Sequence, residues 1–448
     1  MNDSSEHDRA DVNPLPAKRG KLRAAGRFGG RAVASIGDQG CTAATNFLTS
    51  LFIGRMLGPE ILGIYAMTDV IVRVLRALTL SSMIEPLSIY APRRSGDERG
   101  AYLAFLVISQ LTLLGGLTIL LALLSMLWAA AGRLDWSVVP AVVAALFYAN
   151  LILFQALLRR QFYIEGQPTK ALLQSISNLL LVILGFLAFW YWGGADLVSI
   201  YIMLAFAGII VCVVQGWRLF HRLRRPTRQQ RRSFGRETWR YARWNVLSAP
   251  IHQMSISGVI LLAGIMLPIE GAGYLKVGET ILAPFLQVVV GLNLLMLPMV
   301  SKRLDTMSLP QKRRQIVRLS LATLAVAVPY AAAMILLGPW LIRTGFGPDL
   351  MSAVPLLPIF AAIPIFDSLK NQPAVFLSAE GRSDLKLIVE CVRAVLTLAV
   401  GIPLIWGFGV TGAAWARAIA AGAGALMSWS CVLWLWRQQS RQQSRPTA

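Results

Sequence analysis

The stretch RLFHRLRRPTRQQRRSFGRETWRYAR, residues 218–243, carries ten arginines and separates two series of long apolar runs. Six runs precede it and six follow it. Each is long enough to cross a bilayer, which takes about 20 mostly apolar residues. The chain is therefore predicted to be an all-α membrane protein of about twelve transmembrane helices in two six-helix bundles, joined by this basic segment.

The predicted spans share a long apolar core and cover residues 36–56, 63–89, 101–128, 137–158, 169–191, 196–217, 244–267, 272–299, 316–341, 350–369, 385–405 and 410–436. They divide the chain into a basic N-terminal arm (1–35), an N-terminal bundle (36–217), a basic linker (218–243), a C-terminal bundle (244–436) and a tail (437–448). Residues 17–35 are expected to lie along the membrane face as a basic segment.

The basic residues fall in every second connection between these spans. Of the 43 Lys and Arg, 35 lie in the two termini and five alternate loops, whereas the other loops hold only Arg55, Arg133 and Arg343. Positively charged loops stay in the cytoplasm. Both termini are therefore predicted to be cytoplasmic, in a multi-pass protein.

The composition argues against several other classes of protein. Apolar residues make up 56% of the chain and charged residues 15%, well below the roughly 25% charged residues of soluble domains. The net charge of +21 is divided among loops that flank spans, which favours contact with anionic lipids over nucleic-acid binding. The four cysteines lie far apart without metal-ligand spacing, and His252 is the only histidine in a span. Neither a metal site, a cofactor nor an enzymatic activity is expected.

The two halves resemble each other in sequence. Leu57, Glu60, Gly63 and Asp69 recur at a spacing of 210 as Leu267, Glu270, Gly273 and Glu279. Glu165-Gly166 recurs as Glu380-Gly381 at a spacing of 215, and Trp192-Gly193 as Trp406-Gly407 at 214. Because six helices is an even number, both copies enter the membrane from the same side, which predicts a parallel repeat. Transporters with such repeats bind substrate near mid-membrane between the halves.

Three stretches resemble the Wzx-type polysaccharide flippases of the multidrug/oligosaccharidyl-lipid/polysaccharide exporter superfamily. They are GRMLGPEILGIYAMTDVI (54–71), SAEGRSDL (378–385) and WGFGVTGAAWARAIA (406–420). In the first, Leu57, Gly58, Pro59, Gly63 and Tyr65 match the pattern of the first hairpin of that family.

This resemblance implies a MATE-like, V-shaped pair of bundles in the bacterial inner membrane. It also implies alternating access that carries an undecaprenyl-diphosphate-linked oligosaccharide from the inner to the outer leaflet. The implied partners are this substrate, membrane lipids, and the polymerase and export machinery of surface polysaccharide assembly.

Charged side chains inside the spans indicate where a substrate binds, because a charge at mid-bilayer costs at least ~2.5–3.5 kcal/mol. Asp69, Arg73 and Arg76 are spaced four and three residues apart, so they share one face of the second span. Arg73 lies ten residues beyond Gly63, roughly 15 Å deep. Two cations and one anion leave a positive charge that favours a phosphate or an acidic sugar. The alternative is an internal Asp69–Arg73 salt bridge that only packs helices.

Five further residues are substrate-binding candidates in the C-terminal bundle: Lys276, Glu279, Glu390, Arg393 and Arg417. Glu390 and Arg393 are three apart and are an expected internal pair, as are Lys276 and Glu279. Arg417 has no acid within a turn, which makes it a cavity candidate. Asp38 and Asp69 are the candidates for coupling transport to an ion, and Asp38 is expected to reach water from near a helix end.

Two other functions stay open from the sequence. A cation-coupled multidrug exporter of the same superfamily would use Asp38 or Asp69 to carry the ion. A membrane-bound polysaccharide polymerase or acyltransferase would need a large external loop or clustered His and Asp residues, and the short outer loops argue against it.

Overall fold

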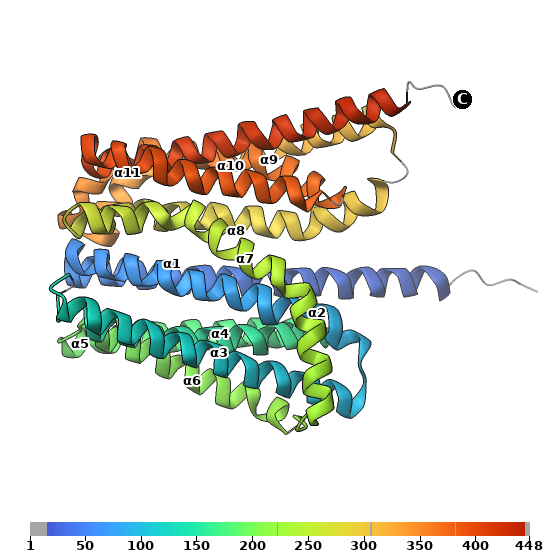
Figure 1. Ribbon diagram of the computed structural model, residues 1–448, viewed down its shortest axis with the longest axis horizontal. Helices are drawn as coiled ribbons and strands as arrows, with labels where there is room; N and C mark the ends of the chain where they lie inside the picture. Colours follow the sequence, from blue (N-terminus) through green and yellow to red (C-terminus); the bar gives the residue numbers. More distant parts are fainter. Residues whose placement is uncertain (1–15, 134, 222, 305–306, 381, 444–448) are drawn as a thin grey trace, which may run out of the picture.

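The computed structural model describes residues 16–443 except 134, 222, 305–306 and 381. This part of the chain contains helices and no strands (Figure 1). The helices are α1 (Pro16–Thr79), α2 (Glu85–Tyr90), α3 (Gly96–Ala130), α4 (Val139–Ile164), α5 (Pro168–Trp192), α6 (Leu197–Phe220), α7 (Arg228–Met266), α8 (Glu270–Leu304), α9 (Leu309–Leu341), α10 (Leu357–Ala379) and α11 (Ser383–Gln443). Residues 1–15 of the predicted arm, the end of the tail and Gly381 of the repeat lie outside the described residues.

Two of the helices contain two spans each. α1 breaks at Gly58 (φ 79°) and α11 breaks at Gly409 (φ 58°), in the left-handed region that favours glycine. Eight helices of the described chain are long and apolar enough to cross a membrane, and α11 is one of them. When α11 is divided and the two halves of α1 and the more polar α8 are added, the described chain has the twelve predicted spans.

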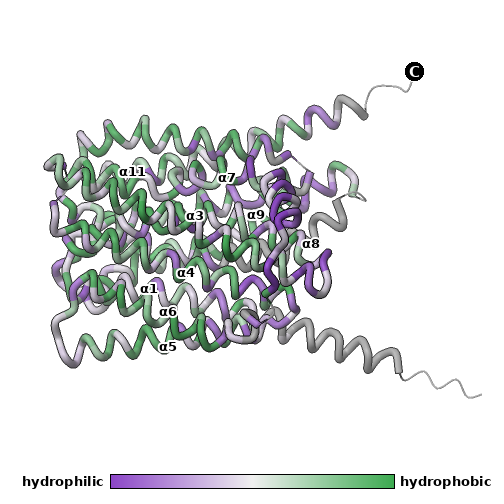
Figure 2. Tube along the Cα trace, turned by 60° about the horizontal axis from the view of Figure 1, so that its bottom comes forward, coloured by the Kyte–Doolittle hydropathy of each residue, from purple (hydrophilic) through white to green (hydrophobic). Residues whose placement is uncertain are grey.

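The molecule has two chemically different ends. At the short-loop end lie the turns at Gly58, Gly193, residues 267–269 and Gly409. At the basic end lie the turn at residues 165–167 and the first residues of α7 and α9. Figure 2 shows the hydrophilic residues gathering at the basic end. The basic loops and the short loops, which alternate along the sequence, therefore lie at opposite ends of the molecule.

The two bundles meet along α1 and α8, which lie side by side at the centre of the molecule (Figure 1). The largest hydrophobic core includes residues of both helices, among them Leu62, Ala66, Leu275 and Leu282. We refer to α1–α6 as the N-terminal bundle and to α7–α11 as the C-terminal bundle. Movement between the bundles must therefore be accommodated at the α1–α8 contact and at the contacts that α7 makes with the N-terminal bundle.

The basic linker is largely helical and packs on the N-terminal bundle. Its residues from Arg228 onward form the first half of α7, which begins with a capping box at Thr227. Phe234 is buried against Tyr102 of α3, and Arg94 lies 4.2 Å from the Tyr102 ring while it pairs with Glu237. Burial and the Glu85 carboxylate raise the pKa of Tyr241, so its hydroxyl stays protonated and donates to Glu85.

The expectation for residues 17–35 was wrong. α1 begins at Pro16 and has no non-helical residue before Gly58. The basic segment therefore continues the helix of the first span instead of turning to lie along the membrane. The physical reason is that nothing between them breaks the helix, since Gly29-Gly30 and Gly37 are tolerated at a cost of about 1 kcal/mol each.

Candidate functional site

The two bundles contact each other closely through a pair of glycines near the short-loop end. A Cβ atom at Gly63 would lie 2.0 Å from the carbonyl oxygen of Ile269, and one at Gly273 would lie 2.3 Å from that of Pro59. Real Cβ atoms do not approach so closely, so only glycine permits this contact. Gly63 and Gly273 are counterparts in the 210-residue repeat, and so are Pro59 and Ile269. The contact is thus built symmetrically from the two halves.

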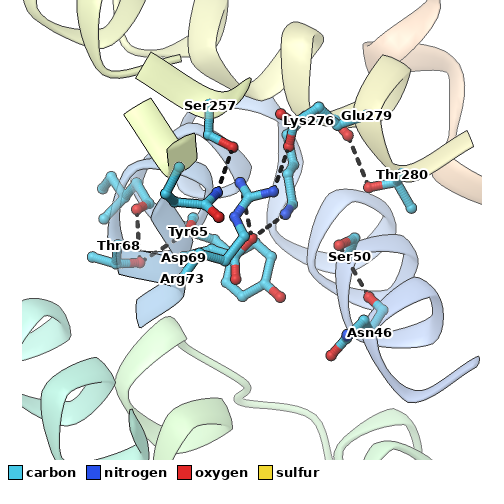
Figure 3. A network of polar contacts seen from close by, with 12 residues as sticks. Asn46, Ser50, Tyr65, Thr68, Asp69, Arg73, Ser257, Lys276, Glu279 and Thr280 are labelled. Atoms are coloured by element: carbon cyan, nitrogen blue, oxygen red, sulfur yellow. Dashed lines mark hydrogen bonds and ion pairs between the residues drawn. The ribbon is translucent and has the colours of Figure 1, made fainter. Parts of the chain in front are cut away.

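Four charged side chains lie below this contact, two from α1 and two from α8 (Figure 3). Lys276 donates to Asp69 across the interface. Arg73 donates to Glu279 at 2.9 Å across the same interface and lies 3.3 Å from Asp69 on its own helix. The two cations and two anions balance, so that none of these charges inside the spans is left without a partner of opposite sign. We call Asp69, Arg73, Lys276 and Glu279 the inter-bundle cluster.

The inter-bundle cluster corrects one expectation and extends another. Lys276 and Glu279 do not pair with each other as expected, because α1 supplies each with a partner of opposite charge. Asp69 and Arg73 do form the internal pair, but Arg73 also reaches Glu279. The Arg73 side chain is 26% exposed, but its Nε and the terminal nitrogen that lies 3.3 Å from Asp69 are buried atoms that donate no hydrogen bond among the described residues. Arg73 therefore has one buried donor, Nε, that no described residue satisfies.

Arg76 is separated from the inter-bundle cluster. Its side chain is exposed and has no ion-pair partner in the described part of the chain. It lines a small pocket of about 40 Å³ between the two halves of α1, α4 and α5, together with Thr45, Asn46, Gln155, Arg159 and Asn178. Thr42, Gln174 and Ser175 complete the polar wall of this N-terminal pocket.

Asp38 lies beside the N-terminal pocket and is fully buried, contrary to the expectation that it reaches water. The Tyr163 hydroxyl donates to it at 2.6 Å, the Ser175 hydroxyl also donates to it, and Arg159 lies 3.6 Å away. Helices α4 and α5 cover this part of α1, so the short aspartate side chain cannot extend past them. Asp38 is therefore held by partners from two other helices, α4 and α5.

The C-terminal bundle contains a cluster around Glu390. The carboxylate accepts hydrogen bonds from His252 and Arg393 at 3.0 Å each, and from Lys370 at 3.3 Å. Ser255 donates to it at 3.1 Å. The structure therefore confirms the Glu390–Arg393 pair and adds donors from α7 and α10. We call these residues the Glu390 cluster.

Arg417 lies near the Glu390 cluster but makes no ion pair among the described residues. It is 2% exposed, its Nη1 donates to the Ser255 carbonyl oxygen at 3.4 Å, and its Nε has no partner. The side chain is thus packed between α7 and α11, and nothing in the described structure places it in an open cavity.

Several of these groups were not identified from the sequence. Arg159 and Lys370 lie at the basic ends of helices, where they resemble topology-setting charges, and Tyr163 and Ser175 are uncharged. The repeat could have pointed to Lys370 and His252. At spacings of 215 and 210 they are the counterparts of Gln155 and Thr42, which are polar residues inside the N-terminal spans.

Residues 33–304 match the family model described as polysaccharide biosynthesis protein. No curated relative matches the chain in sequence. The match includes residues 54–71, from which the resemblance to polysaccharide flippases was drawn.

Solved structures share the fold at low sequence identity. The inward-facing conformation of a multidrug resistance MATE family transporter of the MOP superfamily is 14% identical, with a TM-score of 0.74 over 93% of this chain and 100% of that chain. The lipid II flippase MurJ in its inward closed conformation is 14% identical, with a TM-score of 0.73 over 90% of this chain and 87% of that chain. An outward-facing conformation of a MATE family transporter gives 0.64 at 14% identity, over 92% and 95% of the two chains. The chain is a multi-pass membrane protein with a MATE-like fold, and it belongs to the polysaccharide biosynthesis protein family.

Proposed function

We propose that this protein carries a lipid-linked oligosaccharide, joined to its polyprenyl carrier by a diphosphate, from the inner to the outer leaflet of a bacterial cytoplasmic membrane. The observation that supports this most directly is the inter-bundle cluster: four ionisable side chains from both bundles meet inside the spans. Charges at such depth are costly and belong to transport pathways or to their partners.

The inter-bundle cluster would act as a gate in this proposal. In the described conformation the Gly63–Gly273 contact and the cross-bundle ion pairs hold the bundles together near the short-loop end. An anionic headgroup that approaches Arg73 competes with Asp69 and Glu279 for its guanidinium. The attraction between two opposite charges is strong in a low-dielectric site, and it is lost when one of them turns to another partner. This competition therefore weakens the contact that keeps the bundles closed.

The rest of the cycle follows from alternating access. Loss of the α1–α8 contact lets the bundles separate at the short-loop end, and the headgroup leaves there while its lipid remains in the bilayer. When the site is empty, Lys276 and Arg73 pair again with the carboxylates and the gate closes. Four further residues outside the gate are proposed to contact the substrate: Arg417, Arg393, Glu390 and Arg76. The first three are packed within the C-terminal bundle, which favours a role in holding its helices together.

The orientation belongs to the same proposal. The basic end, with both termini, would face the cytoplasm, where its arginines contact anionic headgroups. The short-loop end would face the outer leaflet, where a polymerase and the export machinery take over the glycan.

A cell that lacks this gene provides the test. Lipid-linked oligosaccharide is expected to accumulate in the inner leaflet, and surface polysaccharide is expected to fall at least about tenfold. The wild-type gene should restore export, while Asp69→Asn together with Glu279→Gln should not, although the variant reaches the membrane. Normal export in the deletion strain would refute the proposal.

A cation-coupled multidrug exporter is the second candidate, and the burial of Asp38 favours it. Asp38 is 0% exposed and is held by two hydroxyls and by Arg159, and an enclosed carboxylate within a span is the kind of group that ion-coupled transport uses. Increased drug susceptibility of the deletion strain with unchanged surface polysaccharide would select this function over the first.

A further inference from the structure

Tyr65 belongs to the motif of the first hairpin, and none of the contacts described above uses it. It lies on the second half of α1, two residues beyond Gly63 and one helical turn before Asp69 (Figure 3). The residue is 6% exposed, although it is next to the charges of the inter-bundle cluster. A buried aromatic ring beside buried charges is a possible partner for a cation.

The ring of Tyr65 is held in place by the N-terminal bundle alone. Its centroid lies 6.0 Å from that of Tyr201 on α6, and Tyr201 is buried. The Tyr201 hydroxyl in turn lies 2.5 Å from the hydroxyl oxygen of Thr68, three residues further along α1. Two helices of one bundle therefore fix the ring independently of the C-terminal bundle.

The ammonium group of Lys276 reaches this ring from the C-terminal bundle. Its Nζ lies 5.1 Å from the centroid of the Tyr65 ring while it donates to Asp69. An ammonium group has three N–H donors, and Asp69 is the only acceptor that the described residues offer to it. The negative face of an aromatic ring attracts a cation within about 6 Å, more strongly where water is excluded. The ring therefore stabilises the part of the ammonium group that Asp69 leaves unsatisfied.

The repeat shows that this contact is not a by-product of the symmetry between the bundles. The close glycine contact and the carboxylates of the inter-bundle cluster occur in both halves of the chain. Tyr65 and Lys276, by contrast, correspond to Leu275 and Ala66 at the spacing of 210. The ring is thus present only on α1 and the ammonium group only on α8.

We propose that Tyr65 is a positioning residue of the gate. Its ring face and the Asp69 carboxylate form one socket on α1, which receives the Lys276 ammonium group when the bundles close at the short-loop end. This inference rests on the proposed function for the role of the closed state in transport, whereas the contact itself does not. Loss of the ring should raise the population of the open gate about fivefold, which corresponds to about 1 kcal/mol.

The ring face can be weakened without a large change in its shape. Full-length protein in lipid nanodiscs is prepared with Tyr65→Phe and with phenylalanine analogues that carry one, two or three ring fluorines, which withdraw negative charge from the face. The melting temperature is expected to fall with each fluorine, and to stay level across the series when Lys276→Met is also present. The same series at Phe285, a buried ring of α8 over which no described cation lies, is the matched control and should not depend on Lys276.

A reporter cysteine measures opening directly. Ala66 is 0% exposed and lies between Gly63 and Asp69 on one side of α1, so a cysteine there meets a charged thiol reagent only when the bundles separate. The four native cysteines are replaced by alanine in this background. A second reporter, Ala149→Cys, is buried in a separate core of the N-terminal bundle and measures general loosening.

The reaction rate of the Ala66→Cys reporter then tests the socket. Tyr65→Leu is expected to raise this rate about fivefold, whereas Tyr65→Phe, which keeps the ring, should stay within about twofold of the wild type. In the Lys276→Met background the two variants should react equally fast. The rate at Ala149→Cys should be the same in all of them.

Three results would overturn the socket: a melting temperature that does not depend on fluorination, equal reaction rates for Tyr65→Leu and Tyr65→Phe when Lys276 is present, or an equal increase at Ala149→Cys. The two proposals fail separately. A fluorine-dependent gate with normal polysaccharide export in the deletion strain keeps the socket and removes the transport function. Blocked export with a fluorine-independent melting temperature does the reverse.

Discussion

In the C-terminal bundle, Glu390 gathers His252, Lys370 and Arg393 into a buried cluster, whereas the matching residues of the N-terminal bundle surround a pocket. A buried cluster of charges that satisfy one another contributes to the packing of its bundle and leaves little for a ligand. In the N-terminal pocket, Arg76 has no ion-pair partner among the described residues. The difference teaches that matching positions of one repeated fold can hold a self-satisfied cluster of charges in one half and a pocket in the other.

The strongest way to break this comparison is to remove the carboxylate at the centre of the Glu390 cluster. Glu390→Ala leaves Arg393, which is 1% exposed, and Lys370 without their shared anion. Breaking a buried ion pair in this way costs about 3–5 kcal/mol. We expect a large fall in the melting temperature of the purified protein. Glu98→Ala, in an exposed pair with Arg94, is the control and should change stability by less than about 1 kcal/mol. An unchanged melting temperature of the Glu390→Ala variant would mean that the Glu390 cluster does not stabilise the C-terminal bundle.

The contact between the bundles can be tested at Gly63. The Cβ atom of Gly63→Ala would meet the Ile269 carbonyl oxygen at 2.0 Å, so α1 and α8 must separate at an expected cost of about 1–3 kcal/mol. Closure at the short-loop end should suffer, and export should fall at least about tenfold. Gly115→Ala on α3, where an added Cβ meets nothing within 4 Å, is the matched control. Equal export by both variants would show that the close contact is not part of the cycle.

The ion pairs below that contact should be coupled across the two bundles. In a double-mutant cycle of Asp69→Asn and Lys276→Met, we expect an interaction free energy of about 1 kcal/mol, because the two side chains pair directly. Thermal unfolding of the four proteins measures it. Additive effects of the two substitutions would contradict the cross-bundle pairing.

The smallest expected effect on stability is that of a substitution at Arg76, and it tests the difference between the two bundles most directly. Arg76 has no ion-pair partner among the described residues, so Arg76→Gln should leave the free energy of unfolding unchanged or raise it, because the substitution removes a charge that no ion pair compensates. Arg393→Gln, by contrast, removes a buried partner of Glu390 and should be clearly destabilising. Similar losses of melting temperature in the two variants would remove the distinction between an open and a self-satisfied site.

Much of the fold was determined by the sequence alone. Bilayer thickness sets the length of each apolar run, and the cost of moving arginines across the membrane sets the alternation of charged loops, so twelve spans could be predicted. The repeat identified Gly63 and Gly273 as counterparts, and the helical period placed Asp69, Arg73 and Arg76 on one stretch of helix.

Only the tertiary structure decided which charges meet. Lys276 pairs with Asp69 and Arg73 with Glu279 because two helices that lie about 200 residues apart in sequence cross at a glycine contact. Local spacing favoured Lys276–Glu279 instead, and local position favoured a solvated Asp38, which α4 and α5 in fact cover. Sequence periodicity fixes the face of a helix on which a side chain lies. Which neighbour that face meets depends on the packing of all the helices together.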